Sequence, residues 1–169
     1  MKYAYYPGCS AHSTARDMHE SCLSVARALG LELEEIKGWS CCGATSAHQT
    51  DRILADSLAA ANLLLARKTG LDMVVTCAAC YNRMRQANHK LKENAQLRRK
   101  VNQVLKAEYH GQVKVRHISD VVVNEYGLEA IAKLMESDLK GMKVVCYYGC
   151  LSARPQKIVA FDDPVYPSY

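Results

Sequence analysis

The chain has 169 residues, of which 49% are apolar and 23% are charged, and its mean hydropathy is −0.18, the composition of one well-filled globular domain. No run approaches the roughly 18 apolar residues of a membrane-spanning helix, and Met1 leads directly into a strand pattern instead of a signal peptide. We therefore expect a cytoplasmic protein without a membrane span.

The net charge of +5 is unevenly distributed along the chain. Residues 79–108 carry eight Lys or Arg side chains against Glu93 and Glu108, a net charge of +6, which leaves −1 for the remainder. Such a segment is typical of a solvated helix face, and it can also dock an acidic partner or attract an anionic substrate. We do not expect nucleic-acid binding, because neither a stacking-aromatic pattern nor a recognition helix accompanies the charge.

The first expected elements are a strand and a helix. Lys2–Tyr6 forms a short strand that ends at a Pro-Gly turn, which places Cys9 just past its carboxyl end. Residues 14–29 follow as a helix with Thr14 as its N-cap. The residues spaced to form its buried stripe are Met18, Cys22, Val25 and Leu29. Cys22 is therefore interpreted as a small core side chain.

A second strand and helix follow in the same way. Leu31–Ile36 has the pattern of a strand, and a helix capped by Ser46 or by Thr50 then runs to about residue 68. The side chains expected to face inward are Leu54, Leu58, Ala61 and Leu65.

The remaining chain repeats the alternation. Leu71–Thr76 is a third strand whose apolar run suits a central position buried on both faces. The basic segment forms one long or broken helix, and residues 113–118 form a fourth strand with Ser119 or Asp120 capping the next helix. Residues 128–136 are expected to be helical, Met142–Tyr148 to be a fifth strand with Cys146 in the core, and the Pro-rich tail from residue 161 to be extended.

This alternation predicts an α/β fold, namely a Rossmann-like parallel sheet of four to five strands with helices on both faces. The carboxyl ends of parallel strands meet at one edge of the sheet, where open α/β sheets place their ligands. The cysteines expected to gather at this edge are Cys9, Cys41, Cys42, Cys77 and Cys80, and Cys150 reaches the same edge.

The adjacent thiols need a special backbone to act together. Neighbouring side chains of a strand point to opposite faces, so Cys41 and Cys42 can share one site only if the chain turns there. Gly43 permits that turn. Cys77 and Cys80 form a C-x-x-C pair of the kind that holds zinc or iron.

Eight cysteines are many for this length, and the chain is too large and too rich in core residues to need disulfides. A structural zinc site and an iron-sulfur cubane each take four ligands, so a fifth thiol is a spare, a bridge, or a ligand to an unusual cluster. The adjacent pair and the remote single thiol depart from zinc ribbons and favour iron-sulfur over zinc. A thiol nucleophile with His12 or His48 as its base is the other alternative.

The two ends of the chain share a K-x-x-x-Y-x-G-C pattern, at residues 2–9 and 143–150. If the pattern is a true repeat, a second adjacent cysteine pair is due near residue 182, beyond the 169 residues of this sequence.

Three motifs resemble the cysteine-rich CCG domain of the heterodisulfide reductase B-subunit family: Tyr-Pro-Gly-Cys at 6–9, Cys-Cys-Gly-Ala at 41–44 and Cys-Ala-Ala-Cys at 77–80. Residues 149–155 and 161–164 resemble the opening of that family's second CCG repeat. The resemblance implies a first CCG domain at residues 1–141 and the start of a truncated second repeat at 142–169.

The resemblance further implies that Cys9, Cys41, Cys42, Cys77 and Cys80 together hold a noncubane [4Fe-4S] cluster. In the methanogen enzymes of the family, two such clusters flank the heterodisulfide of coenzyme M and coenzyme B and split its S–S bond by electron transfer. The implied partners are heterodisulfide reductase-type iron-sulfur subunits, C-like and A-like, and a separate chain that supplies the second CCG half.

We therefore predict an iron-sulfur oxidoreductase subunit that passes electrons to a disulfide or a related substrate. The alternatives are a noncatalytic one-cluster electron carrier, a zinc-stabilised module, and an inactive fragment that lacks the second cluster. No catalytic residue is identified from the sequence.

Overall fold

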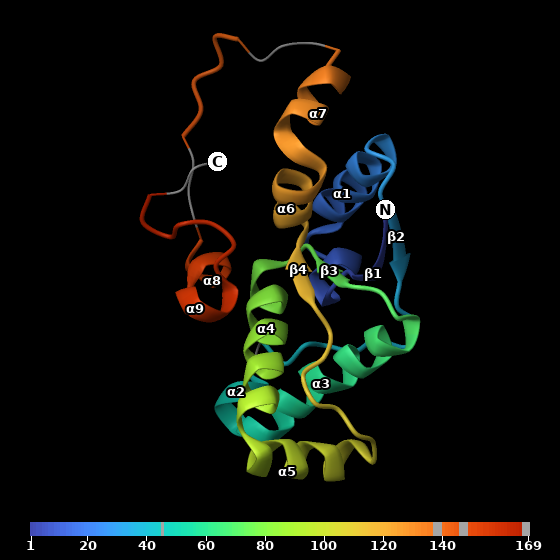
Figure 1. Cartoon of the computed structure of the whole chain (residues 1–169), viewed down its shortest axis with the longest axis vertical. Helices are drawn as coiled ribbons and strands as arrows, with labels where there is room; N and C mark the ends of the chain where they lie inside the picture. Colours follow the sequence, from blue (N-terminus) through green and yellow to red (C-terminus); the bar gives the residue numbers. More distant parts are fainter. Residues whose placement is uncertain (45, 137–139, 146–148, 167–169) are drawn as a thin grey trace.

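A four-stranded parallel sheet forms the centre of the computed structural model, which describes residues 1–44, 46–136, 140–145 and 149–166 (Figure 1). The strands lie in the order β2-β1-β3-β4. Their bounds are β1 Lys2–Tyr6, β2 Glu32–Glu35, β3 Met73–Val75 and β4 Val115–His117. Within β1, Tyr5 pairs with Glu35 on one side and with Val74 on the other. The predicted parallel sheet is confirmed, and β3 is the buried inner strand that its apolar run indicated.

Helices cover both faces of this sheet, as predicted. On one face, α1 (Arg16–Ala28) and the π-helical stretch η2 (Val121–Gly127) pack on the side chains of Tyr3 and Val74. On the other face, α3 (Arg52–Thr69), α4 (Ala78–Glu93) and α5 (Ala95–Leu105) enclose the larger core. The strand side chains in that core include Ala4, Tyr6, Met73 and Val75. The α/β fold class is therefore confirmed.

The predicted buried stripe of α1 is wrong in part. Met18 and Val25 are 45% and 48% exposed, whereas His19 and Ala26 are buried. Cys22 is half-buried, in agreement with its assignment to the inner side of the helix. The rotation has a polar cause, because the His19 ring hydrogen-bonds with its Nδ1 to the buried Tyr5 hydroxyl at 2.9 Å. The helix begins at Arg16, so Thr14 is not its N-cap.

The inner face of α3 is also rotated from the prediction. Ala55, Ala59, Leu63 and Ala66 face the core, and Leu54 is 45% exposed. Small side chains at these positions let the helix lie close to the sheet. The cap of this helix is Asp51, whose carboxylate accepts hydrogen bonds from the amides of residues 53 and 54, so Thr50 is not a cap. Ser46 holds the N-cap position of α2 (Ala47–Thr50), the short helix before α3, without a side-chain hydrogen bond to that helix.

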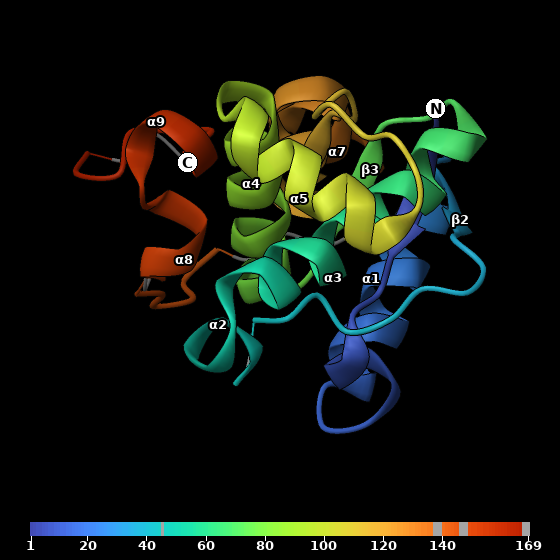
Figure 2. The ribbon, with the colours of Figure 1, turned by 90° about the horizontal axis from the view of Figure 1, so that it is seen from below.

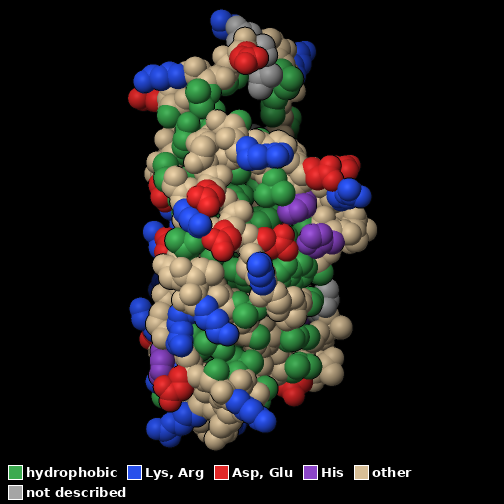
Figure 3. Space-filling view, turned by 90° about the vertical axis from the view of Figure 1, so that its right-hand side faces the viewer, with side chains coloured by type: hydrophobic (Ala, Val, Ile, Leu, Met, Phe, Trp, Pro, Cys, Tyr) green, Lys and Arg blue, Asp and Glu red, His purple; other side chains and the backbone are tan. Residues whose placement is uncertain are grey.

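The basic segment forms two helices, as the broken-helix prediction allowed. α4 and α5 meet at Asn94, whose side-chain oxygen accepts a hydrogen bond from the amide of Leu97 at 2.9 Å. After β4, the side chain of His117 caps α6 (Ile118–Asp120), instead of Ser119 or Asp120. α7 (Leu128–Leu134) then continues from η2. On the face that Figure 3 shows, basic and acidic side chains are interspersed.

The C-terminal segment packs against α4. Its two short helices, α8 (Cys150–Ala153) and α9 (Gln156–Val159), lie beside α4 in Figures 1 and 2. The Tyr81 hydroxyl donates to the carbonyl oxygen of Val159 at 2.6 Å, and Asn82 donates to two further carbonyls of the segment. Of the expected fifth strand, residues 142–145 are not in a strand, and Cys146 with the rest of it lies outside the described residues. No helix in the described part of the chain is long and apolar enough to cross a membrane.

Candidate metal centre

Three loops at the carboxyl edge of the sheet carry the five predicted cysteines. Cys9 begins a single 3₁₀ turn, Cys9–His12, directly after β1. Cys41 and Cys42 lie in the loop that follows β2, Cys77 follows β3, and Cys80 lies in the first turn of α4. The structure thus brings to one edge the thiols that the alternation of strands and helices predicted there.

The sulfurs of these loops contact one another. Cys42 Sγ and Cys80 Sγ are 3.2 Å apart, and both side chains are buried. The Cys80 thiol also hydrogen-bonds with the Cys77 sulfur, and the Cys9 thiol with the Cys41 sulfur. The sulfurs thus make two contacting sets, Cys9 with Cys41 and Cys42 with Cys77 and Cys80, and the adjacent residues Cys41 and Cys42 bring the two sets to the same loop.

Two glycines make this group possible. Gly8 has φ 81° and ψ 157°, and a β-carbon there would lie 3.1 Å from Cys80 Sγ. Gly43 has φ 76°, and a β-carbon there would lie 3.2 Å from the carbonyl oxygen of Ala55 on α3. Only glycine adopts the Gly8 conformation readily. The turn predicted at Gly43 is therefore confirmed.

The loop that carries the adjacent thiols is fixed through Ser40. Its amide donates to Asn62 Oδ1 at 2.9 Å, and its carbonyl accepts from Asn62 Nδ2 at 3.0 Å and from the Tyr6 hydroxyl at 2.7 Å. Asn62 and Tyr6 are completely buried, so these bonds are shielded from water. Tyr6 belongs to the Tyr-Pro-Gly-Cys motif, but neither its role nor that of Asn62 in fixing this loop was predicted. The one feature of the sequence that pointed to the role of Asn62 was a polar residue in the middle of an apolar helix.

The environment of the thiols sets their protonation. The hydrogen bond from the Cys80 thiol, together with the amides of Ala79 and Cys80 at the start of α4, lowers the pKa of Cys77 to about 5. The same Cys80 thiol lowers the pKa of Cys42 to about 7. The pKa of Cys80 is raised because it shares its proton with both neighbours. Burial raises the pKa of Cys9. Cys77 is thus held as a thiolate, the form that binds metals, and the pKa of Cys42 is lowered in the same direction.

The donor set fits an iron-sulfur group. All the candidate ligands are soft cysteine sulfurs, which are the usual protein ligands of such groups. Among the described residues, no three Cys, His, Asp or Glu side chains surround one point in the geometry of a single bound metal ion. The role of the five cysteines as ligands stays a prediction.

The other predicted residues lie around this group. Cys150 is exposed at the start of α8, and the next residue lines a cavity with Ala44 and Ala79, so the C-terminal segment reaches the same edge. His12 stacks on Trp39 with ring centroids 5.6 Å apart. His48 lines the same cavity as Ala44. In the residues that the structure describes, no hydrogen bond joins a cysteine to a histidine, so no thiol-base pair is formed.

The cavity beside the thiols has a volume of about 210 Å³. Ala44, Ala79 and Leu151 give it apolar walls, and its polar lining consists of His48, Asn82, Arg83 and Gln86. Ala79 and Leu151 directly neighbour Cys80 and Cys150 in the chain, so a small molecule bound there would lie close to these two residues.

A buried ion pair braces the elements around this cavity. Arg83 Nη2 lies 2.7 Å from Asp56 Oδ1, and only 3% of the Asp56 side chain is exposed. Lys90 approaches the same oxygen at 3.4 Å. These contacts tie α3 to α4 one turn beyond the thiols, and neither Arg83 nor Asp56 was singled out from the sequence.

Together, the parallel sheet and the thiol-lined edge define a cysteine-rich α/β domain. Comparison with known proteins agrees with this description: residues 3–85 match the family model described as CCG, cysteine-rich domain. A protein of Archaeoglobus profundus that is named as similar to the B subunit of heterodisulfide reductase is 31% identical over 173 residues, which cover 99% of this chain and 58% of the relative.

Two further relatives have related names. The 8-methylmenaquinol:fumarate reductase membrane anchor subunit of Wolinella succinogenes is 31% identical over 170 residues, covering 99% of this chain and 58% of that protein. The B subunit of the ferredoxin/F420H2-dependent CoB-CoM heterodisulfide reductase of Methanosarcina acetivorans is 28% identical over 160 residues, covering 92% of this chain and 53% of that protein. The resemblance expected from the motifs is therefore confirmed.

Residues 3–85 thus match the CCG cysteine-rich domain, and the chain is similar along most of its length to B subunits of heterodisulfide reductases. It spans between 53% and 58% of the length of these relatives.

Proposed function

We propose that this chain is an iron-sulfur subunit of a heterodisulfide reductase-type oxidoreductase. In this proposal, a noncubane [4Fe-4S] cluster is held by Cys9, Cys41, Cys42, Cys77 and Cys80. The observation that carries it is the gathering of these five cysteines, from the ends of three parallel strands, at the carboxyl edge of the sheet. The names of the relatives support the oxidoreductase class.

When bound, such a cluster supplies electrons to a disulfide and an iron that acts as a Lewis acid toward a substrate sulfur. The chain's own residues hold the ligands in place. The Cys80 thiol and the amides at the start of α4 lower the pKa of the Cys77 sulfur, and Gly8 leaves room for the Cys80 sulfur. The cavity beside Ala44 and Ala79 would bind the sulfur-bearing part of the substrate against this group.

The proposed partners follow from the same family. We propose C-like and A-like iron-sulfur subunits as the electron donors, and a separate polypeptide or further sequence that supplies the second CCG half. The cytoplasm is the proposed location, because a reducing compartment preserves clustered thiols.

Metal analysis after anaerobic reconstitution with iron and sulfide tests the cluster. The expected result is a brown protein with about four irons per chain and a paramagnetic resonance signal after oxidation or reduction. Changing Cys41 or Cys42 to Ser should remove most of the iron. The matched control is Cys22→Ser, because Cys22 is also partly buried but lies on α1 outside the thiol group.

Two results would overturn the proposal. One is a colourless protein with one zinc per chain, which would indicate a zinc-stabilised module instead. The other is equal iron content in the Cys41→Ser, Cys42→Ser and Cys22→Ser variants. Circular dichroism of the iron-free variants shows whether each one still folds, so loss of the fold is distinguished from loss of a ligand. A protein that holds the cluster but does not reduce disulfides in the presence of its partner subunits would instead be an electron carrier.

A further inference from the structure

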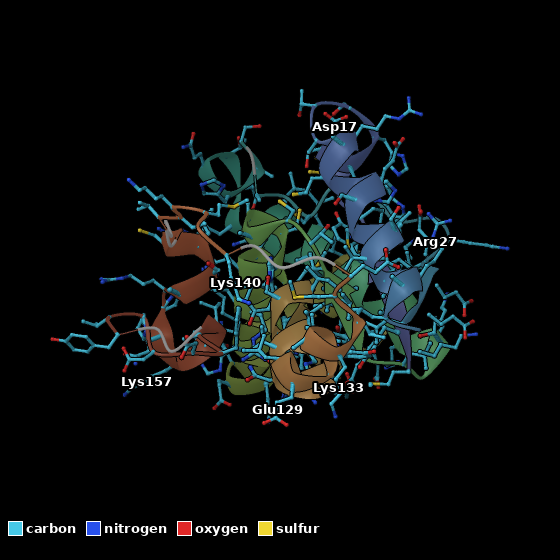
Figure 4. The ribbon with its side chains drawn as sticks, turned by 90° about the horizontal axis from the view of Figure 1, so that it is seen from above. Asp17, Arg27, Glu129, Lys133, Lys140 and Lys157 are labelled. Carbon is cyan, nitrogen blue, oxygen red and sulfur yellow. The ribbon has the colours of Figure 1, made fainter. Side chains whose placement is uncertain are left out.

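A second cavity lies on the outer side of α4, away from the thiols. Its volume is about 180 Å³. Arg85, His89 and Lys92 line it from α4, and their spacing of four and three residues places them on one face of the helix. Lys157 lines the cavity from α9, and it lies 65 residues after Lys92 in the chain. Figure 4 marks Lys157 at the margin of the molecule.

The cavity is strongly cationic. It is lined by three cationic side chains, those of Arg85, Lys92 and Lys157, and by no carboxylate. Within the described ranges, no ion pair joins any of these three side chains to an acidic residue, whereas Arg83 and Lys90 on the same helix both pair with Asp56. The positive charge that lines the cavity is therefore not neutralised by the described part of the protein.

The walls of the cavity are held in place by the fold. Arg85 Nε donates to the carbonyl oxygen of Ile158 at 2.7 Å, which fixes the guanidinium between α4 and α9. Gly111 has φ 81°, and a β-carbon there would lie only 2.7 Å from the carbonyl oxygen of Asn88. The loop before β4 can therefore lie directly against α4. Asn88 in turn donates to the carbonyl of Val113 at 2.7 Å.

Like charges that line one cavity repel one another, and the attraction of each to a bound anion would offset this repulsion. Lysine ammonium groups and an arginine guanidinium are the side chains that bind phosphate, and charge-assisted hydrogen bonds to such groups are strong. We propose that Arg85, Lys92 and Lys157 bind a small phosphate-bearing anion in this cavity. This site goes beyond the proposed function, because Lys92 lies on α4 about 18 Å along the helix axis from Cys80, at a rise of about 1.5 Å per residue.

A small ligand fits the shape better than a protein surface does. The site is concave, and its volume of about 180 Å³ accommodates a phosphate or diphosphate group with a few further atoms. A ligand that contacts Lys92 and Lys157 together would also join α9 to α4. Its binding should therefore slow the local opening of the C-terminal segment.

The probes are inorganic phosphate and pyrophosphate, titrated calorimetrically at constant ionic strength against a chloride blank. We expect saturable binding of at least one probe, and about tenfold weaker binding for Lys92→Gln and for Lys157→Gln. The matched control is Lys100→Gln, which removes the same charge from an exposed position on α5 outside the cavity. Hydrogen exchange of the amides at 156–159 should slow on binding in the wild type and change little in Lys157→Gln.

Three outcomes would overturn the proposal. One is an equal loss of affinity in the Lys100→Gln control, which would indicate general charge attraction. Another is no binding of either probe above the chloride blank. The third is binding of an acidic peptide such as oligoglutamate without binding of phosphate or pyrophosphate, which would make this face a docking surface for an acidic protein. None of these outcomes depends on iron, so the result is independent of the proposed cluster.

Discussion

Replacing Gly8 by alanine should destabilise the fold and disturb the thiol group at the same time. The backbone of Gly8, at φ 81° and ψ 157°, lies in a region that only glycine occupies readily, and a side chain held there costs about 1–3 kcal/mol. The new β-carbon would lie 3.1 Å from Cys80 Sγ, so the sulfur must also shift by a few tenths of an ångström. We expect a total loss of about 3 kcal/mol in the free energy of unfolding.

Gly70→Ala is the matched control. Gly70 ends α3 at φ 72° and ψ 6°, in the left-handed helical region, and a β-carbon there would have no other atom within 4 Å. Alanine there should cost about 1 kcal/mol. In urea, at a slope of about 2 kcal/mol per M, the midpoint should fall by about 1.5 M for Gly8→Ala and by about 0.5 M for Gly70→Ala. The iron content after reconstitution should fall for Gly8→Ala alone. Equal midpoints and equal iron contents for the two variants would refute this reasoning.

Three further predictions concern the surroundings of the thiol group. Arg83→Met should lower the free energy of unfolding by about 3 kcal/mol, because it removes the nearest cation from the buried Asp56 carboxylate. The double variant Arg83→Met with Asp56→Asn should recover part of this free energy, as measured by urea unfolding. In the reduced, iron-free protein, Cys77 has a pKa of about 5, so its alkylation by iodoacetamide should stay fast down to about pH 6 and slow only as the pH falls through 5. Cys22, whose pKa is raised by burial, should react slowly throughout. Equal alkylation rates for the two cysteines, measured by peptide mass spectrometry, would contradict this prediction. Asn82→Ala removes two hydrogen bonds to the C-terminal segment, so limited proteolysis within residues 150–160 should become faster, and an unchanged rate would show that the apolar contacts of α9 hold the segment without them.

The sheet and the thiol edge were predictable because their signals are local. β1 and β3 are short, mostly apolar runs closed by a turn or a loop, and parallel connections leave the carboxyl ends of all four strands at one edge. The three cysteine motifs follow β1, β2 and β3 within a few residues, and this alone brings them together. The Gly43 turn was predictable for the same reason, since adjacent thiols can face one site only through a turn.

The rotations of the helices were not predictable, because their causes are distant in sequence. α1 turns its His19 face inward to reach the Tyr5 hydroxyl, 14 residues away. α3 presents small residues and Asn62, which bonds to Ser40, 22 residues earlier in the chain. A polar residue on an apolar helix looks like a surface position until its buried partner is known. The packing of α8 and α9 on α4 had no local signal either, because side chains of α4 bind backbone carbonyls of that segment.

The anion site and the thiol group share α4 and should nevertheless act independently. Arg85 is the residue of the anion site that lies nearest to Cys80 along α4, five residues or about 7.5 Å away. At that distance two unit charges interact through solvent by about 0.6 kcal/mol, and physiological salt, with a screening length of about 8 Å, reduces this further. The helix connecting them is braced by the buried Arg83–Asp56 pair, so binding at one end is not expected to move the other. The affinity for pyrophosphate should therefore change less than twofold between the wild type and Cys41→Ser, measured calorimetrically on iron-free protein. A change of tenfold or more would mean that α4 shifts as a unit when either site is altered, and the rigid-helix reasoning would be wrong.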